Sequence, residues 1–127
     1  MFGLMILWTS FSASGAAIPI VEVLYLNHGP MQPVVKQLKD TFSKYDGKIK
    51  VSWYDLDTSD GQKFMASLDI REHVPLIIRI NGSDTVKLPQ GNVRLAGFPV
   101  GSGPEPFQGK WTMKNLEAVL DQATARK

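Results

Sequence analysis

The heptapeptide Asn27-His28-Gly29-Pro30-Met31-Gln32-Pro33 separates two runs of different hydrophobic pattern, and the predicted fold follows from this junction. An almost continuously apolar run, Ile18 to Leu26, leads into it and is typical of a central strand covered on both faces. An amphipathic run, Pro33 to Tyr45, leads out of it, with apolar residues at helical spacing. We therefore expect a strand, a tight Gly-Pro turn and a helix whose N-terminal N–H groups point outward and favour negative charge.

The rest of the chain alternates between strands and helices. The pattern predicts strands at 49–56, 76–80, 85–88 and 93–96, and helices at 62–68 and 113–123. Thr112 and the polar run Asp57 to Asp60 are typical N-cap residues, and Asn81-Gly82 is a hairpin turn signal. This order predicts an α/β domain with a right-handed βαβ unit and a mixed central sheet.

Length and composition are those of a single globular domain. The chain has 127 residues, of which 43% are hydrophobic and 20% are charged. The net charge of +2 comes from basic residues scattered among acids, so no basic stripe favours nucleic acid as a partner. Cysteine is absent, which excludes a disulfide, a thiolate nucleophile and a dithiol redox cycle.

Residues 1–17 are interpreted separately from the domain at 18–127. They carry no charge, and an apolar run followed by small residues predicts a signal peptide that ends at Ser14 or Ala17. The protein would then be secreted or periplasmic. The run is shorter than the roughly 20 apolar residues of a membrane span, so no stable span is expected. The alternatives are an uncleaved anchor, or an extra element of the fold in a cytoplasmic protein.

Three features of the domain resemble the thioredoxin family. His28-Gly29-Pro30-Met31 stands where the family has Cys-Gly-Pro-Cys, between a strand and a helix. Val74-Pro75, directly before a strand, is similar to the segment that carries the family's cis-proline. Glu22 lies six residues before His28, at the spacing of the family's buried acid. The resemblance implies a three-layer α/β/α sandwich with a central mixed sheet.

The departures from the family decide the expected function. Neither cysteine position holds cysteine, so thiol–disulfide exchange is excluded and we do not expect an enzyme. The resemblance implies a groove beside the cis-proline that binds an extended peptide or protein without cysteine. A structural domain without a working site is a further alternative. The expected groove residues are Asn27, His28, Gly29, Pro30, Met31, His73, Val74 and Pro75.

A copper site is the main alternative to peptide binding. His28 and His73 are the only histidines, and both fall on loops that the resemblance brings together. With Met31 they form an imidazole and thioether ligand set, which suits Cu(I). Catalysis without a thiol would use His28 as a general base oriented by Glu22 or Glu72, but no nucleophile is evident.

The loop from Gly97 to Lys110 is long and holds four Gly and three Pro. We expect an irregular segment that extends the groove, docks a partner or simply connects two elements. Phe98, Phe107 and Trp111 are expected to pin this loop to the body of the domain.

Overall fold

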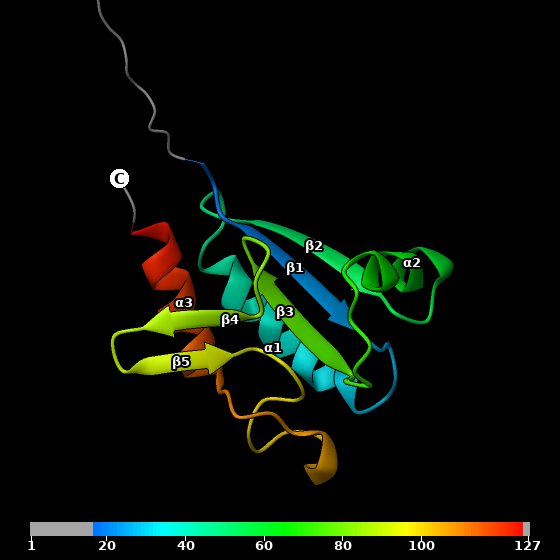
Figure 1. Cartoon of the computed structure of the whole chain (residues 1–127). Coiled ribbons are helices and arrows are strands. Elements are labelled where there is room, and N and C mark those ends of the chain that lie inside the picture. The colour runs from blue at the N-terminus through cyan, green and yellow to red at the C-terminus, as the bar shows by residue number, and fades with distance from the viewer. Residues whose placement is uncertain (1–16, 126–127) are drawn as a thin grey trace, which may run out of the picture.

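A computed structural model describes residues 17–125, so residues 1–16 of the predicted signal peptide lie outside the described part. The described residues form a mixed α/β structure with three α-helices (Figure 1). Within them, none of the helices has the length and hydrophobicity needed to cross a membrane. In chain order the elements are β1 (Ile20–Tyr25), α1 (Met31–Ser43), β2 (Lys50–Asp55), α2 (Ser59–Ser67), β3 (Leu76–Ile80), β4 (Thr85–Leu88), β5 (Gly91–Arg94), a 3-10 turn (Glu105–Phe107) and α3 (Met113–Thr124).

The central sheet is mixed and has the strand order β2-β1-β3. β1 is parallel to β2 and antiparallel to β3. Residues 95–97 extend this sheet beyond β3, because the Ile78 N–H donates to the Leu95 carbonyl at 2.9 Å and the Gly97 N–H donates to the Leu76 carbonyl at 2.7 Å. The predicted mixed sheet is therefore present in the described residues.

The strands after β3 pair differently from the sequence prediction. Asn81 and Gly82 form the predicted turn, with φ of 51° and 89°. The turn does not join two full strands of one hairpin, since β4 pairs with β5 in a separate two-stranded sheet. β5 also begins at Gly91 rather than at the predicted Val93.

Helices cover both faces of the central sheet (Figure 1). α1 and α3 pack on one face, where Leu76, Ile78 and Ile80 of β3 join their core cluster. α2 lies on the other face, where Ile77 joins a second cluster. Because strand side chains alternate between faces, a strand buried on both sides is apolar at nearly every position.

Two helices begin earlier than the sequence predicted. α1 begins at Met31, although Pro33 still falls in its first turn, where a missing N–H is tolerated. α2 begins at Ser59, three residues before the predicted start. The Thr58 hydroxyl caps α2 by accepting the Gly61 N–H at 3.1 Å, which confirms an N-cap in this polar run.

Two polar contacts connect the end of α1 to α3. Tyr45 lies two residues after α1, and its hydroxyl donates to the Asp121 carboxylate of α3 at 2.7 Å. Burial and this hydrogen bond to Asp121 raise the pKa of Tyr45. The Lys44 ammonium pairs with Glu117 at 2.8 Å, and this hydrogen bond raises the pKa of Lys44.

Candidate functional site

The loop after β1 and the segment before β3 lie side by side. The Leu26 N–H donates to the Pro75 carbonyl at 2.9 Å, one step beyond the paired residues Tyr25 and Leu76. The antiparallel ladder between β1 and β3 therefore continues into the two loops that sequence analysis expected to meet.

The Val74–Pro75 peptide bond is trans, so the predicted cis-proline is wrong. No cis peptide bond occurs between residues 17 and 125. Trans is the default isomer of an X–Pro bond, and a Val-Pro pair before a strand does not by itself select cis. Pro75 still stands directly before β3, a position where its missing N–H is tolerated.

The segment Arg71 to Val74 has an unpaired backbone. Within residues 17–125, none of its N–H or carbonyl groups forms a hydrogen bond with another backbone group. Its first three residues are exposed and Val74 is half-buried. Free backbone N–H and carbonyl groups next to the start of a strand are available to pair with the backbone of another chain.

Two pockets flank this segment, and together they form what we call the Pro75 groove. The α2 pocket has a volume of about 610 Å³ and is lined by Leu26, Leu56, Gln62, Met65, Ile70, Arg71, Glu72, His73, Val74, Pro75 and Phe107. The loop pocket has a volume of about 410 Å³ and is lined by His73, Val74, Pro75, Arg94, Ala96, Gly97, Pro106, Phe107, Gln108, Gly109 and Lys110. The pockets share four residues, so they adjoin one another.

Phe107 lines both pockets, whereas the sequence predicted that it packs against the body of the domain. Phe98 and Trp111 are 4% and 0% exposed and anchor the 97–110 loop as predicted, helped by a 3.0 Å hydrogen bond from the Trp111 indole to the Gly97 carbonyl. Phe107 is instead 51% exposed, so the prediction that it pins the loop is wrong. An exposed aromatic ring in an apolar groove is typical of a binding surface.

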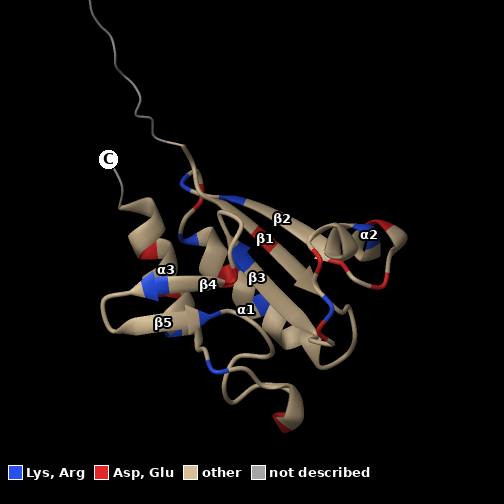
Figure 2. Ribbon diagram, in the orientation of Figure 1, with Lys and Arg blue, Asp and Glu red and all other residues tan. Residues whose placement is uncertain are grey.

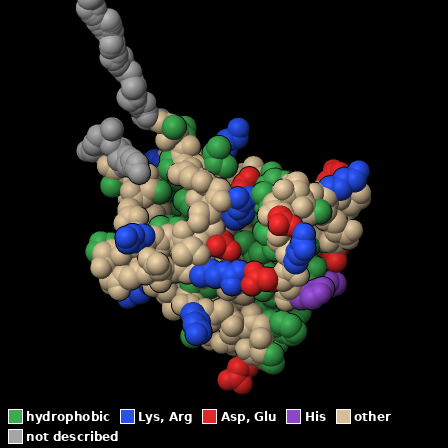
Figure 3. All heavy atoms as spheres, in the orientation of Figure 1, with side chains coloured by type: hydrophobic (Ala, Val, Ile, Leu, Met, Phe, Trp, Pro, Cys, Tyr) green, Lys and Arg blue, Asp and Glu red, His purple; other side chains and the backbone are tan. Residues whose placement is uncertain are grey.

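The sequence held a signal for this placement of Phe107. Pro104 and Pro106 precede it, and the 3-10 turn Glu105–Phe107 that they favour carries the ring to the loop tip. Figure 3 shows hydrophobic side chains next to histidine at the lower right of this face of the molecule.

A cluster of ion pairs ties the segment 71–74 to β5. Arg94 contacts the Glu72 carboxylate and also donates to Asp84 at 3.3 Å. The hydrogen bond with Glu72 is the main reason why the pKa of Arg94 is raised. Because the contact uses only side-chain atoms, it positions the segment and leaves its backbone groups free.

The first predicted loop contacts a different neighbour. His28 Nε2 lies 3.5 Å from Asp57 Oδ2, and the Asn27 amide donates to Asp55 at 3.4 Å. The Gln32 amide donates back to Asn27 at 2.9 Å. These contacts join the start of α1 to the connection between β2 and α2, and neither Asn27 nor His28 lines the two pockets.

The start of α1 does not present free N–H groups as predicted. The Met31 N–H donates to the His28 carbonyl, the Gln32 N–H donates to the Gly29 carbonyl, and Pro33 has no N–H. This end of α1 therefore has no anion site of the expected kind. Gly29 and Pro30 are exposed, whereas the Met31 side chain is 1% exposed and belongs to the core.

The three predicted copper ligands occupy different environments. The His28 side chain pairs with Asp57, His73 lines both pockets, and the Met31 thioether is buried under α1. In the described part of the chain, no three histidine or carboxylate side chains gather as a metal-binding group. A shared ion would require α1 to release Met31 from the core.

Glu22, the predicted buried acid, is paired across the sheet. It lies opposite Arg79 on β3, and their side-chain atoms approach to 3.2 Å. The two side chains are 19% and 17% exposed. A largely buried carboxylate needs a partner for its charge, and Arg79 is that partner for Glu22. The pair therefore gives Glu22 a structural role in the sheet.

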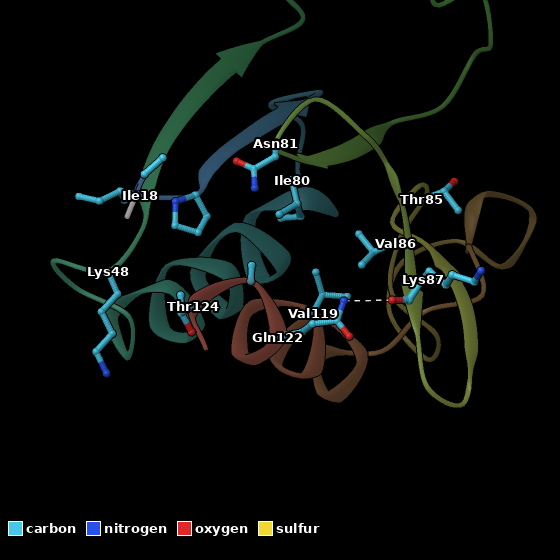
Figure 4. A pocket seen from close by; sticks show the side chains of 13 residues that line it. Ile18, Lys48, Ile80, Asn81, Thr85, Val86, Lys87, Val119, Gln122 and Thr124 are labelled. Carbon is cyan, nitrogen blue, oxygen red and sulfur yellow. Dashed lines mark hydrogen bonds between the residues drawn. The ribbon is translucent and has the colours of Figure 1, made fainter. Parts of the chain in front are cut away.

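A larger hollow of about 820 Å³ lies at the opposite end of the sheet (Figure 4). Ile80 and Val86 contribute apolar surface to it, and Gln122 donates to the Lys87 carbonyl at 3.0 Å across its side. Lys48 and Lys87 are the titratable side chains among its described lining residues, and Figure 4 shows them on opposite sides. The hollow therefore brings no acid and base together.

Comparisons of the chain with family models, with curated proteins and with solved structures found no match.

Proposed function

We propose that the chain is a redox-inactive thioredoxin-like module whose Pro75 groove binds an extended segment of a peptide or protein. The observation that carries the proposal is the unpaired backbone of Arg71 to Val74 between two pockets. In strand addition, main-chain hydrogen bonds supply affinity and pockets for alternate side chains supply specificity.

The order of the elements supports the thioredoxin-like part of the proposal. A parallel β1–α1–β2 unit is followed by α2 on the opposite face and by an antiparallel β3. His28-Gly29-Pro30-Met31 spans the junction of β1 and α1, where the family carries its active-site motif. The trans bond at Pro75 departs from the family, but pairing with residues 71–74 does not require a cis bond.

The absence of cysteine excludes thiol–disulfide exchange by this module. Thiol–disulfide exchange requires a thiolate to attack and another to resolve the mixed disulfide, and none of the 127 residues can supply one. The groove itself is built from backbone groups and apolar side chains, so its capacity to bind does not depend on a thiol.

Fluorescence anisotropy with the full chain tests the proposal. The probe is a fluorescein-labelled peptide, Gln-Thr-Leu-Thr-Gln, with both ends blocked. Threonine favours an extended backbone, and leucine suits an apolar pocket. We expect saturable binding with a Kd on the order of 0.1 mM, because a short flexible peptide loses entropy on binding.

The control peptide has the same side chains and N-methyl groups on its three central residues. N-methylation removes backbone donors, so we expect binding at least about tenfold weaker, the loss of one or two net hydrogen bonds. Equal binding of the two peptides would contradict backbone pairing.

A further inference from the structure

We propose that the Pro75 groove prefers a peptide with an apolar residue and a carboxylate two positions apart, and that Lys110 binds the carboxylate. This inference rests on the proposed function of the groove and adds the class of peptide that it selects.

The charged residues that line the groove differ in whether they are paired. Arg71 pairs with Asp69 at 3.0 Å, and Glu72 pairs with Arg94. Lys110 lines the loop pocket and is exposed, and it forms no ion pair among residues 17–125. The groove therefore offers an incoming peptide one uncompensated positive charge.

The charge of Lys110 meets no free carboxylate among the described residues that line the groove. Glu72 lines the α2 pocket, the loop pocket has no Asp or Glu in the part of its lining that the structure describes, and the Glu72 carboxylate is paired with Arg94. Figure 2 shows basic and acidic residues interspersed over the rest of the molecule, in keeping with the net charge of +2. A preference for acidic peptides would thus arise locally, from complementarity at Lys110.

The spacing of side chains on an extended peptide suits two adjoining pockets. Residues i and i+2 of a strand point to the same side and lie roughly 6.6 Å apart. The α2 pocket and the loop pocket adjoin along His73, Val74, Pro75 and Phe107. We infer that a peptide lying across this shared boundary places an apolar side chain in the α2 pocket and the side chain two positions away in the loop pocket, which Lys110 lines.

Competition against the labelled Gln-Thr-Leu-Thr-Gln probe tests this preference on the full chain. The competitors are blocked peptides that differ in their two outer residues: Glu-Thr-Leu-Thr-Glu, Gln-Thr-Leu-Thr-Gln and Lys-Thr-Leu-Thr-Lys. Their symmetry places the charge two positions from leucine for either direction of the peptide. We expect the Glu peptide to bind about threefold to fivefold more tightly than the Gln peptide, the effect of a partly exposed ion pair, and the Lys peptide to bind least tightly.

Two variants assign the effect to one residue. Lys110→Gln is expected to abolish the difference between the Glu and Gln peptides. Lys114→Gln is the matched control, because Lys114 is exposed on α3 and lines neither pocket of the groove. The advantage of the Glu peptide should remain in this control and should shrink for the wild type at 0.5 M salt, since salt screens exposed charges.

The outcomes separate this inference from the proposed function. Equal binding of all three peptides would overturn the preference for a carboxylate and leave the groove in place. A Glu advantage that persists in Lys110→Gln would overturn the role of Lys110. Absence of binding by every peptide would overturn the proposed function as well.

Discussion

Replacing Phe107 with serine is expected to weaken peptide binding about tenfold while the domain stays folded. The Phe107 side chain is 51% exposed, so a bound peptide can bury the remaining half. A phenylalanine buries roughly 150–250 Å², and half of this area is about 100 Å². At about 25 cal/mol per Å² this is at most about 2.5 kcal/mol. Covering a little over half of it gives about 1.4 kcal/mol, which is about tenfold in Kd.

Anisotropy with the Gln-Thr-Leu-Thr-Gln probe measures this effect, and Val100→Ser is its matched control. Val100 is 55% exposed on the same loop but lines neither pocket, so its replacement should change the Kd by less than about twofold. Urea unfolding should show that both variants remain folded, with losses in the free energy of unfolding under about 1 kcal/mol. An unchanged Kd in Phe107→Ser, or an equal loss in Val100→Ser, would show that the peptide does not bury the Phe107 ring.

Two further predictions concern the scaffold. Tyr45→Phe removes the hydrogen bond to Asp121 and should lower the free energy of unfolding by about 1 kcal/mol in urea at pH 7. Folding raises the pKa of Tyr45, so this hydroxyl ionises at lower pH in the unfolded state than in the folded state. The difference in free energy of unfolding between the wild type and Tyr45→Phe should therefore become smaller as the pH rises above about 10. A constant difference from about pH 7 to 11 would contradict this. Gly103→Ala should lower the Tm more than Gly101→Ala. Both glycines have positive φ, but only a Cβ at Gly103 would meet the Phe98 ring, at 2.5 Å. Equal Tm values for the two variants in thermal unfolding would be evidence against this packing.

Strong local patterns made much of the fold predictable. The strands at 76–80 and 85–88 were predicted with their observed bounds, because apolar and β-branched runs there are bounded by Pro75 and the Asn81-Gly82 turn. Thr112 was predicted to cap the last helix, and it forms a capping box with Asn115. Such signals are local, so a single sequence carries them.

Strand pairing and helix starts were harder to predict. The first residues of α1, Met31 and Gln32, belong to a Gly-Pro turn in which two carbonyls accept their N–H groups. The pairing of Glu22 with Arg79 depends on the register of β1 against β3, which the separate runs do not specify.

The candidate site depended on burial, which sequence analysis could not assign. Phe98 and Phe107 both lie in a loop rich in Gly and Pro, and the same buried position was predicted for both although prolines precede only Phe107 closely. Gly103 packs against the Phe98 ring, which is buried, whereas Phe107 is the last residue of a 3-10 turn and is half exposed. The unpaired backbone of residues 71–74 likewise became visible only when the positions of the neighbouring segments were known.

Amide hydrogen exchange of Arg71 to Val74, with and without saturating Gln-Thr-Leu-Thr-Gln, reports whether a peptide pairs with the backbone of this segment. In the free protein these N–H groups have no backbone acceptor among residues 17–125, so they should exchange rapidly. We expect the bound peptide to slow exchange by at least about tenfold at the N–H groups of this segment that donate to its backbone. Unchanged exchange throughout the segment at saturating peptide, or slowing confined to another part of the chain, would contradict strand addition in the Pro75 groove.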